Sequence, residues 1–356
     1  MRSQRIVLSL SLLLWLPIAA VGAQAQTSRA ASAASYLERG AAWMEKGEID
    51  RAIADYDLAI VFDSQSSVAR YNRGVARQCK GNLAGALEDF NKAIKLNPRY
   101  LDAYINRGKI HSEQGNSEAA INDFNQAIAI NPDDTRAYNN RAAARQRAGD
   151  PDGALADFNR AIRLDRRNAA AWGNRCGLRY RRGEYIEALA DCNRALKLDA
   201  RSAYAWNNRG LARQEKGDPD GALADFDRAI ALDPRQADFH GNRGRAWLAQ
   251  GEPERALGDL NRALALDPEL AEAWSHRGAV WFAKGDLTRA IADYDQALKL
   301  NPRLADAYCS RGATWLAQDK LKEAEADFAR CRSLGRSLKP EAEALLREMK
   351  RRHRPK

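Results

Sequence analysis

A 34-residue unit recurs nine times along this chain, and it limits the possible folds more than any other feature. The stretch 203–234, AYAWNNRGLARQEKGDPDGALADFDRAIALDP, is a representative copy. Equivalent residues are always 34 positions apart, without an insertion, and in copies one to nine they are Gly40, Gly74, Gly108, Ala142, Cys176, Gly210, Gly244, Gly278 and Gly312. This regularity excludes two unrelated globular domains, although 356 residues would be enough to form them.

Each copy has the pattern of two helices joined by a tight turn. A first helical run is followed by Gly217-Asp218-Pro219, by a second helical run and by a stop at Asp233-Pro234. Gly suits the left-handed end of the first helix, Asp the N-cap of the second helix, and Pro its first position. The same turn recurs at 149–151 and 251–253. The sequence therefore predicts two antiparallel helices in every copy.

Small residues recur where the two helices would cross. The residue equivalent to Ala222 is Ala in all nine copies, and the residue equivalent to Ala229 is Ala in eight. A short side chain lets two helix axes approach each other. Aromatic side chains fill the larger gaps, at Phe90, Phe124, Phe158, Phe226 and Phe328 in the second helices.

These copies resemble the tetratricopeptide repeat family in their period, their small residues and their terminal Pro. The resemblance covers residues 33–338. It implies an all-α fold: a right-handed α-solenoid superhelix of nine helix-turn-helix repeats, whose first helices line a concave groove. One position departs from the family, because this chain has Arg where the family usually has Leu before the Gly.

The N-terminal segment has the pattern of a secretory signal peptide. Two arginines lie within residues 1–5, an apolar run follows at 6–21, and Ala23-Gln24-Ala25 offers a cleavage site after Ala25. An uncleaved membrane anchor is the alternative, although the run is short and Pro17 interrupts it. We therefore expect a signal peptide at 1–25, a short linker at 26–32, a periplasmic or secreted protein, and no stable membrane insertion after cleavage.

A charged pair recurs in every copy at a constant spacing. The first members, here called the ladder arginines, are Arg39, Arg73, Arg107, Arg141, Arg175, Arg209, Arg243, Arg277 and Arg311. Sixteen residues later lie the ladder aspartates, Asp55, Asp89, Asp123, Asp157, Asp191, Asp225, Asp259, Asp293 and Asp327. Antiparallel helices would bring each pair face to face in a bidentate contact. We interpret Arg209 and Asp225 as a structural ion pair; anion binding by the arginines is the alternative.

An Asn precedes the ladder arginine in six successive copies, at Asn72, Asn106, Asn140, Asn174, Asn208 and Asn242. Asn is a poor residue for a helix interior, so its recurrence needs a reason. On the groove face, each amide would offer the donor and acceptor that the backbone of an extended peptide requires. The pattern resembles the peptide-binding repeats of eukaryotic O-linked N-acetylglucosamine transferases, without their catalytic domain. Alternatively, the amides bond to neighbouring helices or were duplicated without selection.

A second stripe lies three residues after the Gly position. It holds Arg145, Arg179 and Arg213 in the middle copies and Trp in outer copies such as the first, at Trp43. Positive charge in the groove would favour acidic segments or a polyanionic glycan. The alternative is that the arginine stems cover apolar neighbours.

Five cysteines suggest disulfide chemistry in an exported protein. Cys176 replaces the usual Gly and Cys192 the usual aromatic residue of the fifth copy, so two facing positions changed together. We predict a possible disulfide there. Cys309 and Cys331 have a weaker case in the ninth copy, where small core residues are the alternative, and Cys79 has no expected partner.

The segment 339–356 is expected to form a capping helix and a basic tail. Ala342, Leu345, Leu346 and Met349 share one helical face, which would cover the open end of the repeats. The tail, KRRHRPK, is a solvated terminus or a contact for an anionic surface.

The remaining patterns give no sign of catalysis. The four histidines lack partners at metal-ligand spacing, and neither a phosphate-binding Gly loop nor a nucleophile elbow is present. The net charge of +10, about +8 without Arg2 and Arg5, does not argue for nucleic acid as a partner. We expect neither enzymatic activity, cofactor nor metal.

The expected function is therefore a non-enzymatic protein–protein interaction scaffold in the bacterial envelope. It would bind an extended, acidic peptide segment in its groove. An export or envelope-assembly factor that handles an anionic polysaccharide is the alternative, and a purely structural spacer is a third possibility.

Overall fold

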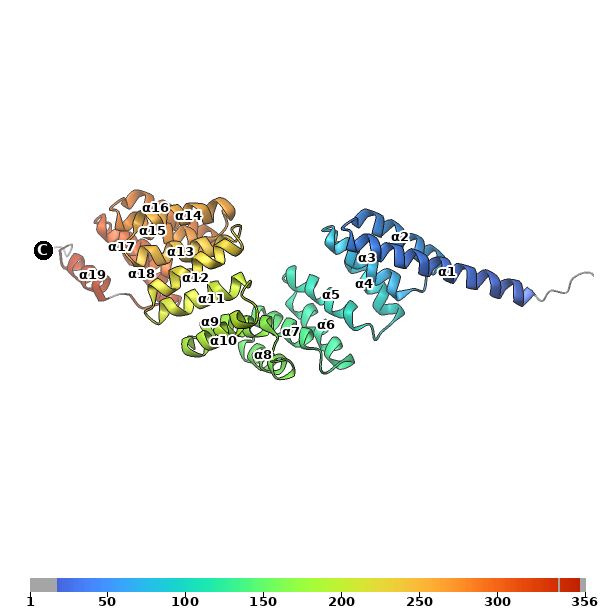
Figure 1. Cartoon of the computed structure of the whole chain (residues 1–356). Helices are drawn as coiled ribbons and strands as arrows, with labels where there is room; N and C mark the ends of the chain where they lie inside the picture. Colours follow the sequence, from blue (N-terminus) through green and yellow to red (C-terminus); the bar gives the residue numbers. More distant parts are fainter. Residues whose placement is uncertain (1–17, 339, 353–356) are drawn as a thin grey trace, which may run out of the picture. The chain divides into compact units, whose positions relative to one another are not determined.

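The computed structural model describes residues 18–338 and 340–352, and within them it contains nineteen α-helices and no strand (Figure 1). The predicted all-α fold is confirmed. The helices are α1 (Ile18–Glu45), α2 (Ile49–Phe62), α3 (Ser67–Cys79), α4 (Leu83–Leu96), α5 (Leu101–Glu113), α6 (Ser117–Ile130), α7 (Thr135–Arg147), α8 (Pro151–Leu164), α9 (Ala169–Arg181), α10 (Tyr185–Leu198), α11 (Ala203–Glu215), α12 (Pro219–Leu232), α13 (Ala237–Ala249), α14 (Pro253–Leu266), α15 (Ala271–Ala283), α16 (Leu287–Leu300), α17 (Ala305–Ala317), α18 (Leu321–Ser333) and α19 (Pro340–Arg352).

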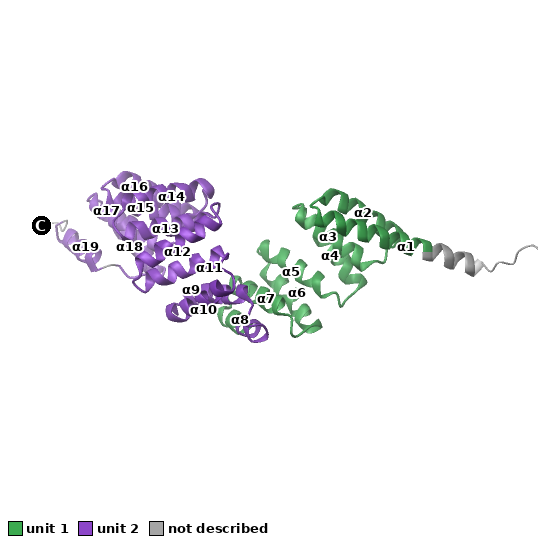
Figure 2. Ribbon diagram, viewed as in Figure 1, with its two compact units in different colours: residues 1–157 green, residues 158–356 purple. Residues whose placement is uncertain are grey.

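The chain divides into two compact units, residues 1–157 and 158–356, with the boundary inside α8 (Figure 2). In unit 1, α1 packs on α2 and α3 on α4, and α2 also packs on α3. In unit 2, the pairs α11 with α12 and α13 with α14 are joined in the same way by contacts between α12 and α13. Each unit is therefore an α-solenoid built from the predicted helix-turn-helix repeats.

The turn predicted at 217–219 has the expected chemistry. Gly217 has a φ of +78°, in the left-handed region that favours glycine. The Asp218 carboxylate accepts a hydrogen bond from the Gly221 amide at 3.0 Å, and Pro219 begins α12. In the corresponding turn at 251–253, Glu252 makes no capping bond, so α14 begins without a side-chain cap.

Small residues let the paired helices touch, as their recurrence predicts. The nine alanines equivalent to Ala222 are all fully buried. A Cβ atom on Gly210 would lie 2.8 Å from Cε1 of Phe226, so the missing side chain makes room for the phenyl ring of the second helix. The aromatic ring of one helix thereby packs on the backbone of its partner.

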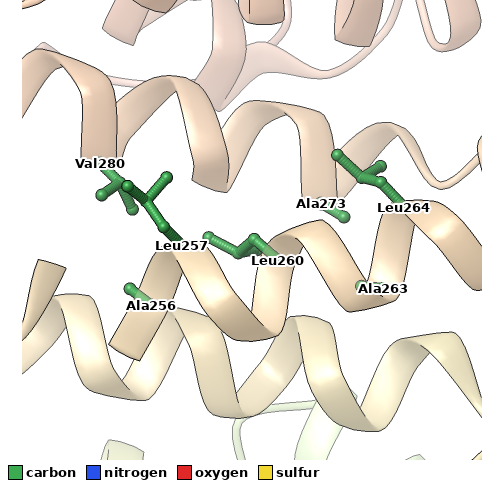
Figure 3. Packing of buried hydrophobic residues seen from close by; sticks show 7 residues of the cluster. All are labelled: Ala256, Leu257, Leu260, Ala263, Leu264, Ala273 and Val280. Atoms are coloured by element: carbon green, nitrogen blue, oxygen red, sulfur yellow. The ribbon is translucent and has the colours of Figure 1, made fainter. Parts of the chain in front are cut away.

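The core also joins each repeat to the next one. Figure 3 shows the cluster around α14, where Leu260 takes the place of the usual aromatic residue. In this cluster Leu257 lies beside Val280, and Leu264 lies beside Ala273 of α15. Burying these side chains against a neighbouring copy explains why single copies would lack a sufficient core.

The two ends of the described chain differ from the repeats. Residues 26–32, which the sequence suggests as a linker, belong to the long helix α1, and Arg29 Nη2 donates to the carbonyl of Val61 at 3.4 Å. At the other end α19 packs on α17 and α18 with Leu346 and Met349 buried, whereas Leu345, expected on the same face, is exposed.

The N-terminal expectations concern mostly residues that are not described. Residues 1–17, with most of the predicted signal peptide, and residues 353–356 of the tail lie outside the described part. Among the described helices, none combines the length and apolar character needed to cross a membrane.

Candidate functional site

The ladder arginines and aspartates form the predicted ion pairs. Nε and Nη2 of Arg209 donate to the two carboxylate oxygens of Asp225 at 2.8 and 2.7 Å. The same two bonds occur in all nine copies, at 2.5–2.9 Å. The Asp225 side chain is only 2% exposed and that of Arg209 is 13% exposed. Arg209 and Asp225 therefore are the structural pair that their spacing predicts.

The third guanidinium nitrogen links each copy to the preceding one. Nη1 of Arg209 donates to Oδ1 of Asn193 at 2.8 Å. Every ladder arginine from copy two onward does the same, and the acceptors are Asp57, Asn91, Asn125, Asn159, Asn193, Asp227, Asn261 and Asp295. The signal was present in the sequence, because this position is Asn or Asp in eight copies and becomes Ala329 only in the ninth.

An aromatic ring covers the face of many of these guanidinium groups. Arg209 lies over the ring of Trp206 with 4.5 Å to its centroid, and Arg277 lies over Trp274 at 4.6 Å. Such stacking is a favourable contact for a cation. The three nitrogens of the Arg209 guanidinium already donate hydrogen bonds, and one of its faces is covered by Trp206. This arrangement disfavours the alternative in which the ladder arginines bind an anion.

The second arginine stripe also binds the ladder aspartates. Nη1 of Arg213 lies 2.9 Å from Oδ2 of Asp225 and donates to the carbonyl of Gly221 at 3.0 Å. The corresponding contacts of the other two arginines, at 2.9 and 2.7 Å, join Arg145 to Asp157 and Arg179 to Asp191. The expectation that these three arginines present free positive charge is corrected, because each shares a ladder aspartate with the ladder arginine and has a second carboxylate of its own copy within 3.4–3.7 Å of its Nε. The second carboxylates are Asp150, Glu184 and Asp218.

In the first copy, Trp occupies the position of these arginines and makes an equivalent contact. Nε1 of Trp43 donates to Oδ2 of Asp55 at 3.1 Å. Hydrogen bonding from Arg39, helped by this indole, lowers the pKa of Asp55. The Arg and Trp forms of this position can thus both supply a second donor to the ladder carboxylate.

Two members of the Asn stripe bond to the preceding first helix. Nδ2 of Asn106 donates to the hydroxyl of Tyr71 at 3.0 Å, and Nδ2 of Asn242 donates to Oδ1 of Asn207 at the same distance. One N–H of Asn106 and one of Asn242 thus bond to a neighbouring helix, and each amide keeps a second N–H and its oxygen.

The remaining members of the stripe differ in exposure. Asn72, Asn140 and Asn208 are half-buried, whereas Asn174 is exposed and also has an interaction partner. Asn208 lies against the preceding first helix, because a Cβ atom on Gly177 would be 2.8 Å from its Nδ2.

Two disulfides occur in unit 2. Cys176 and Cys192 are joined, with Cα atoms 5.4 Å apart and both side chains fully buried. Cys309 and Cys331, for which the sequence argument was weaker, are also joined with a Cα distance of 5.4 Å. Cys79 is exposed and free.

A pocket of about 370 Å³ opens on the first helices of unit 2, and its lining comes from α9, α11, α13, α15 and α17. Asn242, Arg245 and His276 belong to this lining. Nη2 of Arg245 donates to Oε1 of Gln214 at 3.3 Å, but its Nε is buried without a hydrogen-bond partner. Burial and the charge of Arg245 lower the pKa of His276 to about 4, although Asp306 opposes this shift. His276 is therefore neutral near pH 7.

Three carboxylates line the same pocket at one repeat position, Asp238 on α13, Glu272 on α15 and Asp306 on α17, and all three residues are exposed. We call them the rim carboxylates. Sequence reasoning missed them because the position changes character among the other copies, with Val68 in the second and Tyr204 in the sixth. The pocket therefore combines polar groups along its lining with negative charge at its rim.

The described residues hold no group of three or more His, Cys, Asp or Glu side chains that could bind a metal ion. The arrangement in the pocket is suited to binding through hydrogen bonds and charge.

Family models match most of the repeats. Tetratricopeptide repeat models match residues 135–168, 178–243 and 214–278, and a TPR repeat model matches 79–115, 108–149 and 278–319. The chain is a tetratricopeptide repeat (TPR) protein. Among curated proteins, none matches this TPR protein significantly.

Several solved structures share the fold of this TPR protein. A tetratricopeptide repeat protein from Parabacteroides merdae is 21% identical with a TM-score of 0.56, over 70% of this chain and 99% of that one. A chain of the APC/C hetero-tetramer Cut9–Hcn1 is 14% identical with a TM-score of 0.65, over 89% of this chain and 76% of that one. Pseudomonas aeruginosa PilF is 22% identical with a TM-score of 0.50, over 58% of this chain and 94% of that one. At these identities the likeness concerns the fold alone.

Proposed function

We propose that this TPR protein is a non-enzymatic scaffold that binds an extended protein segment along the first helices of unit 2. The observation that carries the proposal is the pocket shared by five first helices, whose lining includes the amide of Asn242 and the guanidinium of Arg245. An extended segment carries unpaired carbonyl and N–H groups that such side chains can bond. The occurrence of the same fold in a hetero-tetramer, Cut9–Hcn1, is in keeping with a role in assembly.

The acidic character expected for the segment is no longer part of the proposal. It depended on Arg145, Arg179 and Arg213, which are paired within their own copies to a ladder aspartate and to a second carboxylate. Binding of an anionic polysaccharide would need the same free positive charge, so no observation favours that alternative.

We also propose that the protein works in the bacterial envelope, as its N-terminal sequence suggests. The disulfides Cys176–Cys192 and Cys309–Cys331 support an oxidising compartment, since disulfides are rare in a reducing cytosol. Fractionation of cells that express the full chain would test this location, and recovery of the thiols in reduced, cytosolic protein would contradict it.

A peptide array probed with the purified protein tests the binding proposal. Asn242→Ala is expected to weaken bound peptides about fivefold, the effect of losing about 1 kcal/mol for one hydrogen bond. Asn106→Ala is the matched control: it removes the same kind of bond to a preceding helix, but Asn106 belongs to unit 1 and does not line the pocket. Failure of every peptide to bind, or equal losses in both variants, would refute the proposal.

A further inference from the structure

We infer that the segment bound in the pocket is basic, with Lys or Arg side chains at every third residue paired to two of the rim carboxylates, Asp238 and Glu272. This inference rests on the proposed function and specifies its partner. It reverses the charge that the sequence alone suggests, because the arginines of the repeats are already paired whereas the rim of the pocket is acidic.

The repeat geometry brings side chains at the rim position within reach of one another. In unit 1 the residues at this position in copies three and four are Asp102 and Arg136, and they form an ion pair at 2.9 Å. In unit 2 the same position holds Asp238, Glu272 and Asp306 in three successive copies. Neighbouring like charges repel, so a cation from outside the repeats would stabilise this arrangement where unit 1 supplies its own.

The chain itself places a guanidinium on one rim carboxylate. Nε and Nη2 of Arg336, in the segment between α18 and α19, donate to the two oxygens of Asp306 at 2.7 and 2.9 Å. This bidentate contact is the geometry by which arginine recognises a carboxylate. Asp306 thus shows that the rim accepts a basic side chain from outside the helix pairs.

The other two rim carboxylates have much weaker partners. Asp238 accepts one hydrogen bond from the Gln236 amide at 3.2 Å. Glu272 has neither a hydrogen-bonding nor an ionic partner within residues 18–338 and 340–352. These two carboxylates are therefore the ones that a bound segment would pair with.

The lining of the pocket can hold the main chain of the same segment. The guanidinium of Arg245 belongs to the lining and makes one hydrogen bond through Nη2, so its other terminal N–H groups can donate to a peptide carbonyl. Arg245 also bonds Gln214, which keeps its guanidinium at the lining rather than on a rim carboxylate. His276 adds no positive charge, since its lowered pKa keeps it neutral near pH 7.

The spacing of the helices selects the spacing of the basic side chains. Packed helices lie about 9 Å apart, so successive rim carboxylates are expected at about that interval. A polyproline II segment advances about 3.1 Å per residue with three residues per turn, so every third side chain returns to the same face after about 9 Å. One basic residue in three would therefore face Asp238 and then Glu272.

Fluorescence anisotropy with labelled nine-residue peptides and the full chain tests the inference. The probes are three Arg-Pro-Pro repeats, a peptide of the same composition with its three arginines clustered at one end, and three Glu-Pro-Pro repeats. The repeated basic peptide is expected to bind about tenfold more tightly than the clustered one, and the acidic peptide more weakly than both. Glu272→Gln should weaken the basic peptide about fivefold, whereas Glu187→Gln, an equal charge change on the exposed surface of α10, should leave it unchanged.

The outcomes separate this inference from the proposed function. Equal or tighter binding of the acidic peptide, equal binding of the two basic peptides, or equal effects of Glu272→Gln and Glu187→Gln would each overturn the basic one-in-three segment. If peptides of other sequences still bind and their affinity depends on Asn242, the proposed scaffold function holds although the segment is not basic. Loss of all peptide binding would instead remove the proposed function.

Discussion

Copies five and six are neighbours in unit 2 that hold their helix pairs together differently. Both have the bidentate pair, Arg175 with Asp191 and Arg209 with Asp225. Copy six fills the space between its helices with Phe226 on Gly210, whereas copy five has the Cys176–Cys192 disulfide at the same two positions.

This difference separates two contributions to the stability of a repeat. The ion pair is independent of what fills the interior, since it has the same geometry in both copies. The interior itself can be closed by an aromatic ring or by a covalent bond. Copy five lacks the ring, so its helix pair depends on oxidation in a way that copy six does not.

Removal of the ladder carboxylate from copy six is expected to have the largest effect. Asp225→Ala should lower the free energy of unfolding by about 3 to 5 kcal/mol, because it leaves two guanidinium groups, Arg209 and Arg213, without their buried partner. Urea denaturation followed by circular dichroism measures the change. An unchanged urea midpoint would contradict a structural role for the pair.

The same substitution in copy five shows whether the disulfide compensates. With the disulfide intact, Asp191→Ala should destabilise less than Asp225→Ala, because the bond still holds α9 to α10. With reductant present, the two losses should become similar. If both variants lose the same stability before reduction, the disulfide does not compensate for the missing ion pair.

Reduction of the disulfide is expected to have the next largest effect, and to act on copy five. A loop closed over a sequence separation of 16 residues accounts for about 3 kcal/mol in the chain-entropy description. Hydrogen exchange should therefore become faster in α9 and α10 on reduction, with less change in α12. The double variant Cys176→Gly with Cys192→Phe copies the packing of copy six and should abolish this local response. Faster exchange in α9 and α10 of that variant on reduction would assign the response to another site.

A Gly to Ala exchange distinguishes the two interiors on a smaller scale. Gly210→Ala should cost about 1 to 3 kcal/mol, because its Cβ atom would lie 2.8 Å from the ring of Phe226. The control lies in copy five, where a Cβ on Gly173 would meet only Ala195 and Ala205, at 3.8 Å. Gly173→Ala should be neutral or stabilising by up to about 1 kcal/mol, since Ala favours helix. Thermal unfolding of both variants checks the contrast, and a loss in Gly173→Ala as large as in Gly210→Ala would argue against close packing as its cause.

The fold was predictable because its determinants repeat. A Gly with an Ala at a constant distance, and Arg209 with Asp225 sixteen residues later, are visible in nearly every copy. Once the two helices of a copy are antiparallel, few arrangements bring these residues into contact. The disulfide in copy five was suggested by the same logic, since two facing positions changed together.

The candidate site was predicted less well because side-chain direction is not given by position alone. Arg213 was expected in a groove, yet it shares Oδ2 of Asp225 with Arg209. The rim carboxylates Asp238 and Glu272 occupy a position that varies between copies, so no periodic signal marks them. Their common place in one pocket appears only when the first helices of three repeats are placed together.

The smallest expected effect concerns the link between copies five and six. Asn193 on α10 accepts a hydrogen bond from Nη1 of Arg209 at 2.8 Å, and it is exposed to water, which can replace the lost acceptor. Asn193→Ala should therefore cost about 0.5 to 1.5 kcal/mol, less than Asp225→Ala. Asn193→Asp keeps an acceptor, as Asp227 does for Arg243 in the next repeat, and should preserve stability in urea denaturation. If both variants lose the same free energy of unfolding, the link depends on the Asn amide itself rather than on an acceptor for Arg209. If neither variant loses stability, the ion pairs stabilise single copies but do not stabilise the contact between neighbouring copies.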